Sequence, residues 1–168
     1  LHNGRLNRYI RMPSSGGTSV TVTTSDTRSW EDLPWDWRDE KFRVVDAGDG
    51  QIALHCTRRN RFLQMHPDGR IRGGSYRNWW NLPASFTYER FRVVDAGDGE
   101  IALHNAQFNR FVRVNSDATM ASSTHMTYRT RLPEDWLHER FRVVNGAPFL
   151  APGSRVALHS ALAERFLA

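Results

Sequence analysis

Seven histidines are the residues of this 168-residue chain that could most readily ligate a metal or transfer a proton. Four of them, His2, His55, His104 and His159, occupy the same place in four similar segments. Metal ligands must converge on one ion, whereas residues repeated around a barrel lie on different sides of it. We therefore predict that these histidines are structural, hydrogen-bonded between neighbouring strands, and that no metal is bound. A pH-sensing surface is the alternative, because histidine titrates near neutrality.

Other residue combinations that carry chemistry are weaker. No Ser-His-Asp order, activated cysteine, carboxylate pair or phosphate-cradling glycine loop rises above chance. Cys56 is the only cysteine, and Asn3 and Asn105 take its place in the equivalent segments, so we interpret it as a bystander. The Asp-Ala-Gly-Asp-Gly stretches at 46–50 and 95–99 lack the further oxygen ligands of a calcium loop and are typical of hairpin turns. The sequence thus predicts a protein that is not an enzyme and holds no cofactor.

An internal repeat is the strongest feature of the chain. A Glu-Arg-Phe or Glu-Lys-Phe triplet, followed at once by Arg-Val-Val, begins at residues 40, 89 and 139, so the period is 49 and then 50 residues. A Leu-Pro pair precedes each triplet at a constant distance. A second motif joins Leu-His to Asn-Arg-aromatic, in full at 52–65 and 101–114 and shortened at 1–12, and a variant of it closes the chain at 156–168.

Each copy of the repeat has the pattern of short β-strands. Apolar residues alternate over short runs broken by Gly, Asp, Asn and Pro, without a sustained helical period. The stretch 91–104 predicts a hairpin in which Gly97 and Gly99 take positive φ. Four strands in each ~50 residues, three times over, are typical of a β-trefoil, in which three such units close a six-stranded barrel capped by three hairpins. A three-bladed β-propeller is the alternative, but its centre would be badly packed, so we predict the trefoil.

The repeat motifs also resemble those of a known superfamily. The segment IALHNAQFNRFVRV at 101–114 is similar to the opening of repeats in the fascin-like, actin-cross-linking β-trefoil superfamily, and ERFRVV is similar to the segment that closes them. This resemblance spans nearly the whole chain. It implies a β-trefoil that occurs in tandem, bundles actin or acts as a binding module, and has no catalytic activity. The Gln-x-Trp triplet of ricin-type sugar-binding trefoils is absent.

The period predicts the domain organisation. We expect one β-trefoil over residues 1–153, with repeats at about 1–50, 51–99 and 100–153. The remaining residues, 154–168, are expected to be the opening hairpin of a further repeat or a closing strand pair.

Two copies of the opening motif compete for one place in a threefold barrel. The copy at 156–168 has Glu164 where the others have asparagine. We therefore predict that residues 1–12 fill the place, and that the last hairpin packs outside the threefold core or pairs with another segment. The chain is then expected to be a window of a longer repeat protein.

Repeated aromatic residues are the predicted core. They fall at equivalent positions in the copies: Phe42, Phe91, Phe141, Phe62 and Phe111. The Asn-Arg-aromatic motif predicts a left-handed asparagine in a tight turn, an arginine that reaches a carboxylate such as the repeated glutamate, and a ring that enters the core. For the three arginines of the motif, Arg8, Arg61 and Arg110, a multivalent anion-binding ring is the alternative.

An individual binding site is best sought where the copies differ, because the scaffold does not require those differences. The most divergent stretches are 13–32, 66–81 and 115–130. The second carries side chains that could stack on a sugar ring or anchor a protein partner: Tyr76, Trp79, Trp80, Arg72 and Arg77. Trp35, like Trp80, has no equivalent in the other copies, whereas Trp79 matches Trp30 and could instead cover the open end of the barrel.

Charge and hydropathy narrow the class of partner. The net charge is +5, but arginine is spread evenly and interleaved with Asp and Glu, whereas a nucleic-acid binder gathers its charge into a stripe or tail. No run approaches the ~18 apolar residues of a membrane span. We expect neither a nucleic-acid partner nor a membrane span, and the single cysteine favours a reducing, intracellular compartment.

The sequence therefore predicts a non-enzymatic binding or scaffolding module that mediates protein–protein interaction. The resemblance implies cross-linking of actin filaments, and incorporation into a larger assembly is the generic form. A lectin-like carbohydrate-binding module that uses Trp79, Trp80 and polar loop residues is the alternative.

Overall fold

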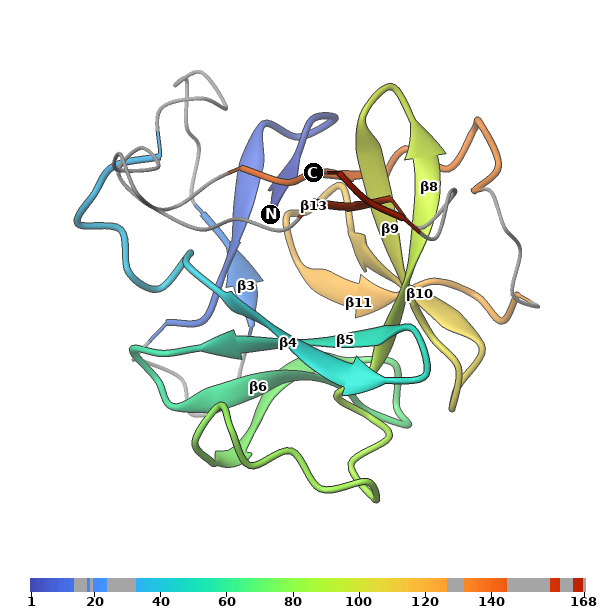
Figure 1. Ribbon diagram of the computed structural model, residues 1–168. Helices are drawn as coiled ribbons and strands as arrows, with labels where there is room; N and C mark the ends of the chain where they lie inside the picture. Colours follow the sequence, from blue (N-terminus) through green and yellow to red (C-terminus); the bar gives the residue numbers. More distant parts are fainter. Residues whose placement is uncertain are drawn as a thin grey trace.

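The computed structural model describes residues 1–13, 18, 20–23, 33–126 and 132–144, together with the backbone of two strands close to the C-terminus. These residues form β-strands and no helix. Twelve strands belong to one continuous sheet, and the last two form a separate two-stranded sheet. Figure 1 shows the blue, green and yellow-to-orange parts of the chain in three sectors around one interior. The prediction of an all-β protein is confirmed.

Each copy of the repeat contributes four strands in the same order. The first repeat forms β1 (His2–Asn3), β2 (Arg8–Arg11), β3 (Thr21–Val22) and β4 (Arg43–Gly48). The second forms β5 (Gln51–Cys56), β6 (Arg61–Met65), β7 (Ile71–Tyr76) and β8 (Phe91–Gly97). The third forms β9 (Glu100–Asn105), β10 (Arg110–Val114), β11 (Met120–Ser122) and β12 (Phe141–Arg142). The terminal pair is β13 (Leu158–Ser160) and β14 (Arg165–Leu167).

Antiparallel pairs between consecutive repeats build the barrel. β4 pairs with β5, and β8 with β9, through the two Asp-Ala-Gly-Asp-Gly hairpins. Within the second and third repeats, β5 also pairs with β8, and β9 with β12. β1 pairs with β12 at His2 and Arg142, so that residues 1–12 lie beside the third repeat. β13 and β14 pair with each other, Glu164 lies outside the described residues, and the domain boundaries stay a prediction.

The tight turns use residue types that tolerate positive φ. Gly97 and Gly99 have φ of 80° and 72°, and the Asp95 carboxylate accepts a hydrogen bond from the Gly97 N–H at 2.9 Å. The asparagine of each Asn-Arg-aromatic motif is also left-handed, with φ between 50° and 54°: Asn7, Asn60 and Asn109. Asparagine enters this region more readily than most residues because its short polar side chain can hydrogen-bond locally. Both sequence predictions about the turns are confirmed.

Aromatic rings of the repeat occupy the interior. Phe91 and Phe141 are fully buried with the aliphatic side chains of the barrel strands, and Phe42 packs against this cluster while partly exposed. Phe62 and Phe111, the rings of the Asn-Arg-aromatic motif, are also buried. Burial of each such ring stabilises the fold by about 2 kcal/mol, so loss of one ring would remove a large fraction of the net stability of a typical domain.

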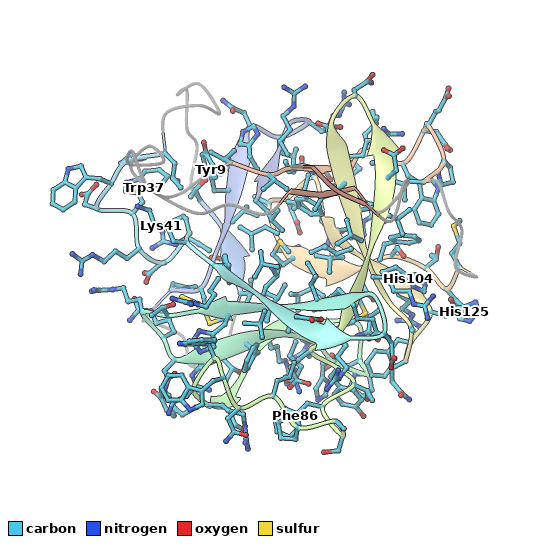
Figure 2. The ribbon with its side chains drawn as sticks, in the orientation of Figure 1. Tyr9, Trp37, Lys41, Phe86, His104 and His125 are labelled. Carbon is cyan, nitrogen blue, oxygen red and sulfur yellow. The ribbon has the colours of Figure 1, made fainter. Side chains whose placement is uncertain are left out.

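The repeated histidines lie inside the protein as well. His2, His55 and His104 are at most 3% exposed, and each imidazole centroid lies 4.9 Å from the aromatic ring of its own motif. The Nε2 atom of His104 contacts Asn109 Oδ1 at 3.0 Å, and Figure 2 shows His125 beside this pair. Burial lowers the pKa of all three histidines, because the interior disfavours the charged imidazolium.

Two asparagines fasten neighbouring repeats together. The side-chain amide of Asn105 donates to the backbone carbonyls of Thr87, Tyr88 and Arg90, at 3.0–3.2 Å. Its oxygen accepts a hydrogen bond from the N–H of Phe108. Asn3 repeats this pattern on carbonyls of the third repeat, with distances of 2.9–3.4 Å. The first and third repeats are thereby joined by side-chain hydrogen bonds as well as by the β1–β12 pair.

A different side chain performs this role in the second repeat, where Cys56 replaces the asparagine. The guanidinium of Arg59 donates to the Met12 carbonyl at 3.1 Å and to Asp39 Oδ2 at 2.7 Å. Burial raises the pKa of the Cys56 thiol. The cysteine is thus a buried neutral group. The side-chain hydrogen bonds to the preceding repeat come instead from Arg59, three residues further along the chain.

The arginine of the Glu-Arg-Phe triplet explains the constant spacing from the Leu-Pro pair. The Arg90 guanidinium donates to the carbonyls of Pro83 and Phe86, at 3.0 Å each, and to the carbonyl of Ala47 in the preceding repeat. Arg140 makes the three equivalent contacts in the third repeat. In the first repeat Lys41 donates to a single carbonyl, that of Trp35. A fork of donors can hold three carbonyls at once, which an ammonium group does less well.

The predicted partner of the Asn-Arg-aromatic arginines is wrong. Arg61 donates to the backbone carbonyl of Gly74, and Arg110 to Ser122 Oγ at 3.3 Å. Both acceptors lie on the strand that pairs with the arginine's own strand. The guanidinium groups therefore join two paired strands of the same repeat.

We expect Asn105→Ala to lower the free energy of unfolding by about 2–4 kcal/mol, because it leaves several buried backbone groups without their partner. Cys56→Ala, at the equivalent position, is the matched control and should cost about 1 kcal/mol, the order for deleting one small apolar group. Urea unfolding followed by tryptophan fluorescence measures both. Equal losses in the two variants would contradict the role assigned to Asn105.

Acid should destabilise the fold through the histidines. The pKa of His104 in the folded protein lies below the ordinary value of 6.5. The contribution of neutral His104 to the free energy of unfolding is therefore complete above pH 6.5 and is lost as the pH falls below that value. We expect His104→Gln, which keeps a hydrogen-bonding side chain, to flatten the pH dependence of stability between pH 7.5 and 5.5 by up to about 1.4 kcal/mol per pH unit. Comparison with the wild type cancels the opposite contribution of the buried glutamates, and parallel curves would refute the assignment.

Candidate binding groove

Two open grooves recur at equivalent places in the first and second repeats. Each lies between the Glu-x-Phe segment, the second and third strands of its repeat, and the following hairpin turn. The second-repeat groove has a volume of about 630 Å³ and is lined by Arg61, Gln64, Gly74, Phe86, Glu89 and Gln107, among others. The first-repeat groove, of about 510 Å³, has Arg11, Thr23, Trp37, Glu40 and Arg58 at matching positions.

The fold fixes the wall of the second-repeat groove that carries Glu89. This residue lies two positions before β8, in the segment clamped by the Arg90 guanidinium. The N–H of Met65, at the end of β6, donates to the Tyr88 carbonyl at 3.0 Å and ties the segment to the strand. The Glu89 carboxylate is therefore held against β6 and β7.

A neutral amide is the side-chain partner of Glu89. Gln64 Nε2 donates to Glu89 Oε1 at 3.2 Å, and the glutamate is 4% exposed. Burial raises the pKa of Glu89, although the positive charges of Arg77 and Arg90 oppose the shift. The equivalent residue in the first repeat, Glu40, lies 3.4 Å from the guanidinium of Arg11.

Glycine at positions 73 and 74 removes side chains from this groove. In the first repeat Thr23 Oγ1 accepts a hydrogen bond from the Tyr9 N–H at 3.1 Å, and in the third Ser123 Oγ accepts one from the Phe111 N–H at 2.9 Å. Gly74 is the equivalent residue in the second repeat. A Cβ atom added to it would lie 3.3 Å from Glu89 Oε1, so the glycine lets the backbone of β7 approach the carboxylate closely without a side chain between them.

Three residues predicted from the divergent stretch 66–81 border the second-repeat groove. The Arg61 guanidinium lies 3.8 Å from the ring centroid of Tyr76 and lowers the pKa of its hydroxyl. Arg77 lies over the ring of Phe86, with the guanidinium carbon 4.5 Å from the centroid. Figure 2 shows Phe86 in the sector of the second repeat. Arg72 lines the groove and forms an ion pair with Asp68 at 2.9 Å.

The predicted tryptophans lie elsewhere on the surface. Trp79 and Trp80 form an edge-to-face pair with centroids 5.5 Å apart, and the Arg43 guanidinium lies 4.3 Å from the Trp79 centroid. Trp80 is 66% exposed. Trp35 is 77% exposed and lines the first-repeat groove, so it is not grouped with the second-repeat residues. Trp30 falls outside the described residues.

Sequence reasoning missed Glu89, Gln64 and Gly74 because it set the symmetric positions aside as scaffold. A signal was present, since Gln64 replaces the arginine of the other two copies and Gly74 replaces their hydroxyl residues. Over the part of the chain that the structure describes, no group of three or more His, Cys, Asp or Glu residues could hold a metal ion. In the same part no helix is long and apolar enough to cross a membrane.

Comparison with known proteins establishes the fold. No protein-family model and no curated protein sequence matches the chain. Its structure is similar to that of a designed 3-fold symmetric protein, ThreeFoil, with a TM-score of 0.60 and 18% identity, over 86% of this chain and 95% of the other. It is also similar to a GlcNAcα1-4Gal releasing endo-β-galactosidase from Clostridium perfringens, with a TM-score of 0.59 and 13% identity.

The second similarity covers 83% of this chain but 30% of the galactosidase, so the chain spans under a third of that protein. At these identities the likeness shows the fold alone. The threefold-symmetric neighbour confirms the predicted β-trefoil-like architecture, and membership of the fascin-like superfamily stays a prediction.

Proposed function

We propose that the chain is a non-enzymatic binding module that holds a carbohydrate in the second-repeat groove. The observation that carries this proposal is the convergence of a carboxylate, an amide and a guanidinium beside aromatic rings: Glu89, Gln64, Arg61, Phe86 and Tyr76. Sugar hydroxyl groups both donate and accept hydrogen bonds, and the apolar faces of a sugar ring pack on aromatic side chains. A concave site with a few converging polar groups is the usual form of a small-ligand site.

The lining of the groove supports binding without catalysis. Glycoside hydrolysis uses two carboxylates, about 5–10 Å apart, on either side of the bond that is cleaved. Among the described residues that line the second-repeat groove, Glu89 is the only carboxylate. The galactosidase of similar fold is named for acting on a carbohydrate, which motivates the choice of ligand class for this chain.

Binding should be visible on a glycan array at micromolar protein. We expect Tyr76→Ala to weaken binding of a positive glycan about tenfold, the scale of one aromatic contact. Trp35→Ala removes an equally exposed ring outside the groove and is the matched control, with affinity unchanged. Melting temperatures of both variants should stay close to the wild type. A blank array would remove the carbohydrate proposal.

A protein partner is the second candidate, and the exposed Trp79–Trp80 pair favours it. Exposed aromatic patches commonly mark interaction sites, and tryptophan is enriched among residues that dominate binding energy. The guanidinium over Trp79 adds a directional cation–π contact. With the resemblance to fascin-like repeats, this surface is proposed to dock an actin filament or a component of another assembly.

Co-sedimentation with filamentous actin tests the actin form. We expect micromolar protein to pellet with filaments, and Trp80→Ala to reduce the pelleted fraction several-fold, since alanine removes most of the contact area. Its melting temperature should be unchanged because the ring is exposed. Failure of the wild type to pellet would refute the actin form, and a large fall in the melting temperature of Trp80→Ala would show that the ring supports the fold instead.

A further inference from the structure

We infer that Glu89 is the one glutamate, among the three equivalent glutamates of the repeat, that is presented to a ligand, and that it accepts hydroxyl hydrogen bonds from an uncharged sugar ring. This inference rests on the proposed function and specifies its site, ligand class and number of sites. It follows from how the three repeats treat the same carboxylate.

The side chain facing the glutamate differs between the repeats. Glu40 is paired with Arg11 at 3.4 Å, and Glu139 with Arg113 at 3.7 Å. In the second repeat the corresponding residue is Gln64, which donates one neutral hydrogen bond at 3.2 Å. The two arginine contacts are ion pairs in which the Nε atom makes no hydrogen bond, so what the arginine supplies is positive charge. The neutral amide of Gln64 supplies none, and its single hydrogen bond leaves acceptor capacity on the carboxylate.

The space beside the carboxylate differs in the same direction. Thr23 in the first repeat and Ser123 in the third occupy the position beside the glutamate, and each hydroxyl oxygen accepts a hydrogen bond from a backbone N–H. Gly74 replaces them, and even a Cβ atom there would come within 3.3 Å of Glu89 Oε1. The three glutamates are similarly buried. Two substitutions, one of charge and one of size, therefore change the surroundings of this carboxylate in the second repeat without changing its burial.

Burial makes this carboxylate a strong acceptor. A carboxylate removed from water is costly unless hydrogen bonds replace its hydration, and burial raises the pKa of Glu89 accordingly. Arg90, one of the two cations that oppose this shift, commits its guanidinium to backbone carbonyls. The carboxylate already accepts hydrogen bonds from the Gln64 amide and from a backbone N–H, and hydroxyl groups of a bound ligand would add further donors.

The mixed charges of the second-repeat groove select an uncharged ligand. An anion placed against Glu89 would meet its negative charge, and a cation would meet the arginines at positions 61, 72 and 77. A polyol meets neither penalty, because each hydroxyl can donate to the carboxylate and accept from a guanidinium. Gln107, from the next repeat, supplies both an amide donor and an acceptor on the facing wall.

Ligand-observed NMR titration with monosaccharides tests the inference. The probes are the methyl glycosides of glucose, galactose, mannose and N-acetylglucosamine, with the methyl glycosides of glucuronic and galacturonic acid as charged counterparts. We expect at least one neutral glycoside to bind with one site per chain, and the matching uronic acid to bind several-fold more weakly.

Two variants isolate the carboxylate. Glu89→Gln keeps the shape and should weaken binding about tenfold, since a charge-assisted hydrogen bond is roughly twice as strong as a neutral one. Glu139→Gln, the same change at the equivalent third-repeat position, is the matched control and should leave affinity within about twofold. The double variant Gln64→Arg with Gly74→Ser reproduces the third-repeat pair, and should abolish binding while the protein stays folded by near-UV circular dichroism.

The outcomes separate this inference from the broader proposal. Equal affinity of wild type and Glu89→Gln, or tighter binding of a uronic acid than of its neutral counterpart, would overturn the role of Glu89. If glycan binding then still depended on Tyr76, the carbohydrate function would stand with a different recognition group. Absence of binding by every glycoside, together with a blank array, would remove both.

Discussion

Backbone carbonyls buried between the repeats are the constraint on which this structure depends. A buried carbonyl without a donor is costly, and the segments between Leu-Pro and Glu-x-Phe lie outside the regular strand ladders. Arg90 and Arg140 hold these segments and also bind a carbonyl of the preceding repeat. Asn3 and Asn105 bind the same segments from the following hairpin. The repeats are therefore joined by side-chain donors as well as by the strand pairs of the barrel.

The same clamp creates the candidate site. Because Arg90 fixes the segment 82–90, the neighbouring Glu89 is directed against β6 and β7. The equivalent segment of every repeat buries a glutamate at the same location: Glu40, Glu89 and Glu139. The scaffold thus provides three equivalent carboxylates, and their surroundings decide what each can do. Arginine partners occupy two of them, and the third faces an amide and a glycine.

This division has an energetic consequence. A buried carboxylate with an arginine partner is partly compensated, whereas Glu89 has hydrogen bonds from an amide and a backbone N–H and no arginine in an ion pair among the described contacts. The second repeat therefore accepts a less compensated charge at this position than its neighbours. Natural proteins commonly retain such locally unfavourable groups where a ligand is bound, at some expense of stability. The surrounding hydrogen bonds from Arg90 and Asn105 keep the segment in place regardless of that expense.

Much of the fold was determined by the sequence alone, because strand alternation, left-handed asparagines, turn glycines and a 49-residue period are local or periodic properties. The contact partners of individual side chains were not determined by the sequence alone. Arg61 was expected to meet a carboxylate and instead meets the Gly74 carbonyl, which lies on the strand paired with its own. Gln64, Gly74 and Glu89 belong to one repeat but are separated along the chain by 10 and 15 residues. Only the pairing of β6 with β7, and the clamped segment folded against them, decided that these three residues meet in one groove.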